Sequence, residues 1–239
     1  MQETIELAWM RYALVDGKKV EAQPKAKGIC PHCQTEMLAK CGRVKVWHWA
    51  HKGNPPCDPW WESETEWHRQ WKDEFPKEWQ EVSHVDPTTK EQHIADVKTP
   101  FGLVIEFQHS IITPEERISR EDFYKQMVWV VDGTRGDLDE SYFNMGLSGP
   151  LQKSPLAYQV TWWGHGRLLT NWVESKVKVY LDFGKDVLWR LLFFDPKKKV
   201  GAVGPLPKKV FIEDCMNGIE ISVAEIPNEE KSDKESHNK

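Results

Sequence analysis

The 239-residue sequence has no long apolar run. No segment approaches the roughly 20 apolar residues that a membrane helix needs, and residues 1–30 carry charges throughout instead of the apolar stretch of a signal peptide. These absences predict a cytoplasmic protein with no membrane partner. Cysteines are few and odd in number, five in all. In a reducing compartment this excludes a disulfide framework and favours roles in metal binding or packing.

Several well-known catalytic signatures are also missing. The sequence has no glycine loop that would cradle phosphates, no G-x-S-x-G motif and no dinucleotide-binding fingerprint, so ATP use and serine hydrolysis lack support. We find no internal repeat. The composition, 39% hydrophobic and 29% charged, is typical of a globular protein with a real core.

The net charge of −5 is unevenly distributed. Residues 1–60 carry a net +3, residues 61–140 a net −10 and residues 141–239 a net +2. A carboxylate-rich centre between basic flanks indicates a cation site beside surfaces that tolerate phosphate; the alternative is a solvated acidic face.

The hydrophobic pattern predicts an α/β protein. A hairpin turns at Asp16-Gly17, and Thr113 caps a helix that runs to about Met127, with Glu116 at the capping-box position. The remaining expected elements are a helix over 60–79, strands over 80–84, 93–98, 103–109 and 128–131, a loop over 137–155, and strands over 156–163, 176–181, 187–194 and 209–213. The order αβββαβ suits a mixed sheet flanked by helices.

Four regions follow from this pattern. They are an N-terminal β-hairpin and zinc-binding segment (1–59), a core (60–136), a β-rich C-terminal extension (137–225) and a disordered tail (226–239). Thirteen tryptophans are present, and we expect most of them in the core, although a stacking platform for bases is the alternative.

The first region carries a zinc-binding pattern. Cys30-Pro-His-Cys33 is followed by His48-Trp-Ala-His51, which gives C-x2-C-x14-H-x2-H. Two close-spaced ligand pairs provide the four tetrahedral ligands of a structural zinc site. Cys41 and Cys57 remain alternative ligands, and the competing interpretation is that these cysteines are ordinary buried thiols.

The central region places acidic residues on adjacent strands. Asp96 precedes Glu106 by ten residues, and an odd-numbered loop would put them opposite one another. Two carboxylates in apolar strands repel each other unless a cation lies between them, and hard oxygen ligands favour Mg²⁺ or Mn²⁺. Gln108 shares the face of Glu106 and could orient a water; the alternative is a pair of solvent-facing carboxylates.

Two helices offer further polar side chains. Glu64, His68 and Lys72 are spaced four apart and share one helical stripe, where Lys72 would supply positive charge. Such a stripe is also typical of an exposed polar face. Arg120 and Tyr124, four apart on the capped helix, would hold a phosphate; alternatively Arg120 pairs only with Glu116.

The sequence resembles the competence protein CoiA-like family, whose members have a zinc-finger-like segment followed by a nuclease core of the PD-(D/E)XK, restriction-endonuclease-like type. The resemblance spans roughly the first 130 residues. The matching stretches are CPHC (30–33), HWAH (48–51), SETEWHRQWK (63–72), IADV (94–97), IEFQHS (105–110) and SREDFY (119–124), with a weaker match at KVYLDFG (178–184).

The resemblance implies a metal-dependent DNA nuclease acting in DNA uptake, recombination or defence against foreign DNA. It implies metal binding by Asp96 and Glu106, and it adds Glu64 as a further acidic member of the catalytic site. Gln108 occupies the position of the usual motif lysine, so Lys72 either compensates or catalysis is weak. His93 stands where we expect an arginine, which puts one phosphate contact in doubt.

Two other functions compete with the nuclease. One is a DNA-binding or recombination-accessory protein that keeps the nuclease-like fold without cutting, which the substituted lysine favours. The other is a zinc-stapled interaction domain, which the overall acidity favours. The expected partner is DNA, whether duplex, branched or single-stranded, and a homo-oligomer or a protein partner is compatible with the sequence.

Overall fold

A computed structural model describes residues 9–52, 57–60, 64–153, 155–162 and 167–219. Within these ranges the chain forms two β-sheets and five α-helices. None of the helices in these ranges has the length and apolar character to cross a membrane. The predicted tail over 226–239 lies outside the described residues.

The first sheet contains the strands of the N-terminal segment, all antiparallel to their neighbours. The β2–β3 hairpin turns at Asp16 and Gly17, with φ values of 50° and 74°, so the predicted turn is confirmed. Trp49 and Met37 are fully buried in its small core. In spatial order the strands are β1 (Trp9–Met10), β6 (His48–His51), β5 (Glu36–Lys40), β4 (Lys27–Ile29), β2 (Tyr12–Val15) and β3 (Lys18–Glu21).

The second, nine-stranded sheet begins with the central region. Strands β7, β8 and β9 are antiparallel, and β10 lies parallel to β9. The elements therefore follow one another in the expected order αβββαβ. They are α1 (Glu66–Asp73), a 3-10 turn η1 (Lys77–Trp79), β7 (Gln80–Val85), β8 (Gln92–Lys98), β9 (Val104–Gln108), α2 (Pro114–Tyr124) and β10 (Met127–Asp132).

Helix α1 is much shorter than the helix predicted over 60–79. Thr65 caps its first turn, where the Thr65 hydroxyl accepts from the backbone N–H of His68 and the His68 ring accepts from the Thr65 N–H. The helix ends at Asp73, and Pro76 follows within three residues. The predicted ends were wrong because Trp60 and Trp79 fit the helical spacing yet lie outside the helix. Glu64 also precedes the Thr65 cap, so of the predicted stripe only His68 and Lys72 lie on α1.

The C-terminal strands extend the same sheet. Strand β13 pairs in parallel with β10, and the remaining strands continue outwards in the order β14, β15, β12 and β11. The elements are α3 (Asp139–Gly146), β11 (Leu147–Lys153), β12 (Leu156–Thr161), α4 (Arg167–Trp172), β13 (Lys178–Asp182), β14 (Val187–Asp195), β15 (Val200–Pro207) and α5 (Lys208–Asn217).

Two predictions in this region were wrong. The expected loop over 137–155 contains α3 and β11. The expected strand over 209–213 is part of α5, in which Phe211 and Cys215 lie one turn apart and are both buried. A short apolar run does not distinguish a strand from a buried helix. The signal that identifies the helix is Gly218, which caps its C-terminus with φ 65°.

Helices cover both faces of the nine-stranded sheet. In β10, Val128 and Val130 face the apolar cluster that contains Trp71 of α1 and Phe211 of α5. Trp129, between them in the sequence, faces the opposite cluster, which receives side chains of α2, α3 and α4. This alternation is that of a strand buried on both faces.

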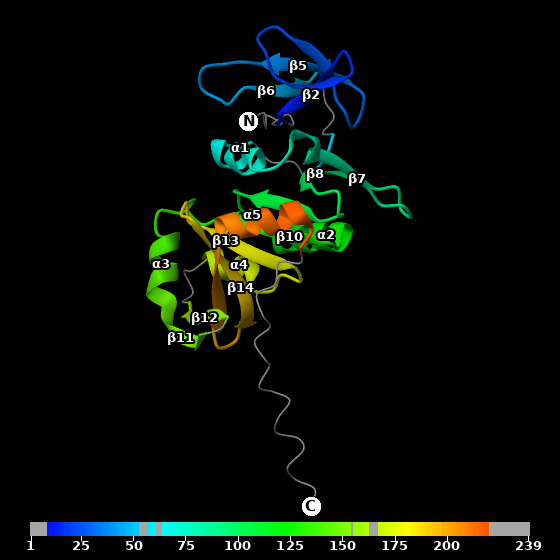
Figure 1. The fold of residues 1–239 in the computed structure, drawn as a ribbon. Helices are drawn as coiled ribbons and strands as arrows, with labels where there is room; N and C mark the ends of the chain where they lie inside the picture. Colours follow the sequence, from blue (N-terminus) through cyan, green and yellow to red (C-terminus); the bar gives the residue numbers. More distant parts are fainter. Residues whose placement is uncertain (1–8, 53–56, 61–63, 154, 163–166, 220–239) are drawn as a thin grey trace, which may run out of the picture.

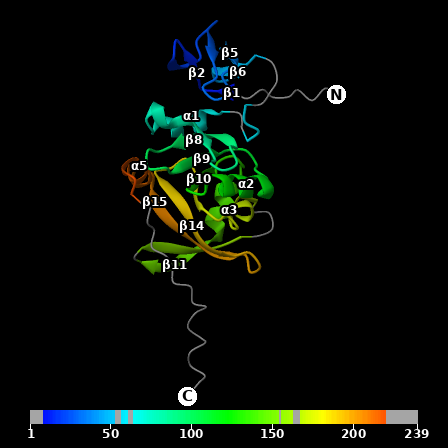
Figure 2. The same ribbon diagram turned by 90° about the vertical axis from the view of Figure 1, so that its right-hand side faces the viewer.

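The N-terminal sheet lies at one end of the molecule, beside α1 and the β7–β8 hairpin (Figure 1). Strand β11 lies at the opposite end in both views (Figure 2). The two sheets meet through Arg11 and Tyr12, which follow β1 and contact residues at the start of β7. The central region (60–136), which carries the predicted acidic site, therefore borders the predicted zinc-binding segment directly.

Candidate functional site

Four soft ligands converge in the N-terminal sheet. The ligand atoms of Cys30, Cys33, His51 and Cys57 all lie within 4.8 Å of one another. Cys30 Sγ lies 3.6 Å from Cys57 Sγ, and Cys33 Sγ lies 3.2 Å from His51 Nε2. Tetrahedral zinc with Zn–S bonds of about 2.3 Å places its sulfurs roughly 3.8 Å apart, so this Cys3His cluster is compatible with structural zinc binding.

The ligand predicted at His48 is replaced by Cys57. His48 and His51 both lie in β6, and residues three apart in a strand point to opposite faces, so they cannot share one ion. The His48 ring instead stacks on Trp9, and its Nδ1 lies 2.8 Å from the carbonyl oxygen of Val46. Cys41, the other alternative ligand, also lies outside the cluster.

The carboxylates of the core meet where β8 and β9 diverge. The register pairs Val97 with Ile105 and, continued by one residue, sets Asp96 opposite Glu106, as the odd-numbered loop predicts. From Val97 towards Asp96, hydrogen bonds from backbone N–H groups to side chains take the place of backbone–backbone hydrogen bonds between β8 and β9. Glu106 Oε1 accepts a hydrogen bond from the Asp96 N–H at 3.1 Å, and Asp96 Oδ2 accepts from the Phe107 N–H at 3.0 Å.

Lys72 lies at the centre of a carboxylate cluster, which consists of the buried Glu64 and Glu81 and the partly exposed Asp96. Its Nζ lies 3.2 Å from Glu64 Oε1, 3.3 Å from Glu81 Oε1 and 3.2 Å from Asp96 Oδ1. Burial alone would lower the pKa of Lys72, but the charges of the three carboxylates outweigh it and raise that pKa well above its ordinary value. Lys72 is therefore positively charged.

Arg120 is the cation that lies beside Glu106. Its guanidinium lies 3.3 Å from Glu106 Oε2 and also contacts Glu116 and the carbonyl oxygen of Trp60. The pair with Glu116 that the sequence left open is thus present beside the pair with Glu106. Arg120 is only 5% exposed, so these contacts are shielded from water.

A polar cavity of about 40 Å³, roughly the space of one water molecule, opens between these groups. Asp96 is its most accessible carboxylate, with 23% of the side chain exposed. The lining includes Glu64, His68, Lys72, Asp96, Glu106, Arg120 and Tyr124, together with Asp58, Trp60 and Ile94. Of the residues predicted for the core site, only Gln108 is outside this lining.

His68 and Gln108 differ in how they are engaged. Both ring nitrogens of His68 have protein partners, Thr65 at Nδ1 and the Phe107 carbonyl oxygen 3.0 Å from Nε2, so His68 joins α1 to β9. Gln108 donates through Nε2 to Ser110 at 3.2 Å. Its Oε1 is buried and has no hydrogen-bond partner among the described residues.

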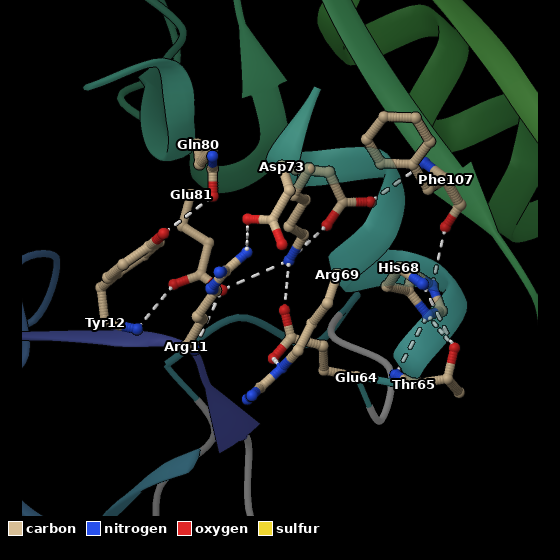
Figure 3. A network of polar contacts seen from close by, with 12 residues as sticks. Arg11, Tyr12, Glu64, Thr65, His68, Arg69, Asp73, Gln80, Glu81 and Phe107 are labelled. Carbon is tan, nitrogen blue, oxygen red and sulfur yellow. Dashed lines mark hydrogen bonds and ion pairs between the residues drawn. The ribbon is translucent and has the colours of Figure 1, made fainter. Parts of the chain in front are cut away.

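Sequence reasoning missed Glu81. This residue lies in β7 between the pairs Gln80–Val97 and Val82–Ala95, with φ 45°, a strained value for a residue other than glycine. Its carboxylate accepts hydrogen bonds from the N–H groups of Arg11 at 3.0 Å and Tyr12 at 3.2 Å (Figure 3). No spacing in the sequence indicates this contact, because it joins the two sheets.

Glu106 has a strongly perturbed acidity. Burial, and then the nearby charge of Asp96, raise the pKa of Glu106 to about 8, against the opposing effect of Arg120. Because the folded pKa is the higher one, the protonated carboxyl favours folding below the ordinary Glu value of about 4.3. That contribution is lost as the pH rises towards 8.

We therefore expect Glu106→Gln to become more stable relative to the wild type as the pH rises. The relative gain should be roughly 1 kcal/mol per unit between pH 5 and pH 8. Urea unfolding at several pH values measures this slope. Glu115→Gln, an exposed position on α2, is the control and should show no slope. If the difference in unfolding free energy between Glu106→Gln and the wild type does not change with pH, the raised pKa of Glu106 is contradicted.

Among the described residues, the Cys3His cluster is the only group in which at least three His, Cys, Asp or Glu ligand atoms lie within 4.8 Å of one another. Asp96 and Glu106 therefore do not form such a group with a third residue of these types. Instead of a third ligand, Lys72 lies beside the Asp96 carboxylate and Arg120 lies beside the Glu106 carboxyl group.

The N-terminal segment has a recognisable relationship. Residues 15–59 match the family model described as the N-terminal domain of competence protein CoiA. Neither a curated protein nor a solved structure gives a significant match to the chain. The matched range contains all four residues of the Cys3His cluster. The comparison thus supports a relationship to the CoiA family through the segment that contains the Cys3His cluster.

Proposed function

We propose that this protein is a divalent-metal-dependent deoxyribonuclease that hydrolyses phosphodiester bonds. The observation that carries the proposal is the meeting of Asp96 and Glu106 across two diverging strands, with Lys72 and Arg120 lining the same cavity. Carboxylates opposed in this way, with fixed cations beside them, suit charge stabilisation at a phosphate.

The proposed core is of the restriction-endonuclease-like type. The order αβββαβ, with β10 parallel to β9 and the carboxylates on β8 and β9, supports it. The N-terminal match to a competence family supports DNA as the partner and DNA uptake as the setting. Recombination and defence against foreign DNA use the same chemistry and are included in the proposal.

The donor set of the cavity suits Mg²⁺ or Mn²⁺. Asp96 and Glu106 offer hard carboxylate oxygens, and the amide oxygen of Gln108 is buried without a hydrogen-bond partner among the described residues. Asp96 and Glu106 would hold the ion, and Gln108, which lies outside the lining of the cavity, would orient a water. When bound, the ion would neutralise charge on a phosphate and lower the pKa of a bound water.

The chain's own cations have separate tasks in this proposal. Lys72 lies 3.2 Å from Asp96 Oδ1 and supplies the positive charge that the amide of Gln108 lacks. Arg120 contacts Glu106 and opposes the rise in the pKa of its carboxyl. Binding of a divalent cation would favour ionised Glu106 still further, so cation binding should release a proton at pH values below about 8.

The test compares Asp96→Asn with Asp122→Asn, which removes an exposed carboxylate that pairs only with Lys176 among the described residues. Purified proteins are incubated with linear duplex, supercoiled and single-stranded DNA, with Mg²⁺, Mn²⁺ or a chelator. We expect metal-dependent cleavage by the wild type and by Asp122→Asn. Asp96→Asn should lose at least about 100-fold in rate, the scale of removing one group that stabilises the transition state.

A second candidate is a DNA-binding accessory protein that does not cut. The observation that favours it is the charge balance of the cavity, where Lys72 and Arg120 already occupy the carboxylates within a space of about 40 Å³. Binding of DNA without cleavage of any substrate, under either metal, would support this function and contradict the nuclease.

A further inference from the structure

A short bridge connects the Cys3His cluster to the candidate catalytic cavity. Residues 57–60 contain a cluster ligand, Cys57, at one end and a cavity residue, Trp60, at the other. Asp58, between them, is 4% exposed and also lines the cavity. The zinc segment and the cavity are therefore joined within four residues of the chain.

Asp58 holds the strand that carries Asp96. Its Oδ2 accepts a hydrogen bond from the Ile94 N–H at 2.6 Å, and its Oδ1 lies 2.8 Å from His93 Nδ1. Oδ1 also accepts from the Trp60 N–H at 2.9 Å, which fixes the bridge itself. Ile94 is two residues from Asp96 in β8, so a shift of Asp58 moves the strand on which the acidic residue lies.

Trp60 provides a second connection, towards Glu106. Its ring stacks on His93, and its carbonyl oxygen accepts a hydrogen bond from Arg120. Arg120 in turn contacts Glu106 Oε2. Both carboxylates of the opposed pair are thus supported by residues that directly follow the cluster ligand Cys57.

We propose that Asp58 is a positioning residue through which the Cys3His cluster holds Asp96 and Glu106 in their opposed arrangement. Zinc at the cluster would fix Cys57, and Asp58 would transmit this constraint to β8. Loss of zinc then weakens catalysis although no cluster ligand touches the cavity. The catalytic part of this inference rests on the proposed nuclease function, whereas the structural coupling does not.

The test measures hydrogen exchange at the backbone amides of Ile94, Asp96 and Phe107. The proteins are the zinc-loaded wild type, the chelated wild type, Asp58→Ala and Asp58→Asn. In Asp58→Ala, we expect exchange at Ile94 to rise about 10-fold or more, the scale of losing a hydrogen bond to a charged acceptor. Its zinc content should remain at one per chain. The chelated wild type should show the same increase.

Asp58→Asn should restore most of the protection. An asparagine oxygen still accepts from the Ile94 N–H, and its amide can donate to His93 Nδ1 in the neutral ring form in which Nε2 carries the proton. The amide group in place of Oδ1 no longer accepts from the Trp60 N–H, so the rescue is judged at Ile94. Rescue by Asn but not by Ala separates positioning through hydrogen bonds from a requirement for charge. Asp86→Ala is the matched control, because Asp86 caps the Thr88 and Thr89 amides at the far end of the same hairpin. The Asp86→Ala substitution should raise hydrogen exchange only at residues 86–91.

A cleavage assay on the same proteins adds the catalytic readout. Asp58→Ala should lower kcat about 10-fold and leave KM for DNA unchanged, because the residue supports the carboxylates without touching DNA. Unchanged exchange at Ile94 and Asp96, either on chelation or in Asp58→Ala, would overturn the coupling. Increased exchange in a protein that never cleaves DNA would uphold the coupling and reject the nuclease.

Discussion

We expect that zinc binds the Cys3His cluster and that its removal unfolds the N-terminal sheet, residues 9–52, while the nine-stranded sheet remains folded. The small sheet buries only a few large side chains, among them Met10, Met37 and Trp49. A core of this size supplies too little stability on its own, whereas zinc contributes about 10–16 kcal/mol in comparable small modules. Hydrogen exchange over β2, β4 and β5 before and after chelation measures the effect.

The ligand set has a direct test in a pair of substitutions. Cys57→Ser should weaken zinc binding by at least about 100-fold, because a hydroxyl is a poor zinc ligand. His48→Gln should retain one zinc per chain, because its ring lies outside the cluster. Zinc content after dialysis, measured by mass spectrometry, distinguishes the two. If His48→Gln loses zinc and Cys57→Ser retains it, the ligands are those that the sequence spacing predicts, with His48 in place of Cys57.

Replacing Lys72 by Met should lower the free energy of unfolding by about 3–5 kcal/mol, the usual effect of breaking a buried ion pair. Without the ammonium group, the buried carboxylates of Glu64 and Glu81 and the partly exposed carboxylate of Asp96 are left facing one another. Methionine has a similar volume, so the loss reflects charge and not a cavity. Urea unfolding at pH 7 gives the difference.

The control for Lys72→Met is Lys176→Met. Lys176 pairs with Asp122 at 2.8 Å, but both side chains are 60% exposed, so its loss should change stability by less than about 0.5 kcal/mol. Adding Asp96→Asn to Lys72→Met should recover part of the stability, because one uncompensated charge is removed. A loss below about 1 kcal/mol for Lys72→Met would show that the carboxylates do not depend on this lysine.

Local sequence determined the parts of the fold that depend on neighbouring residues. Thr113 caps α2 as its position predicts, and Asp16-Gly17 forms the turn between β2 and β3. The five-residue loop between β8 and β9 set the register that opposes Asp96 and Glu106. The sequence also named most residues of the cavity, since alternation along strands and four-residue spacing on helices fix which side chains share a face.

The tertiary structure decided whatever depends on contacts between distant segments. The sequence offered Cys57 only as an alternative, and its selection over His48 required the position of residue 57 beside Cys30. Glu81 and Asp58 carried no signal, because one binds the N–H groups of another sheet and the other binds β8 across 36 positions. Spacing specifies what neighbouring residues can do together, but only packing brings a buried charge to the partners that stabilise it.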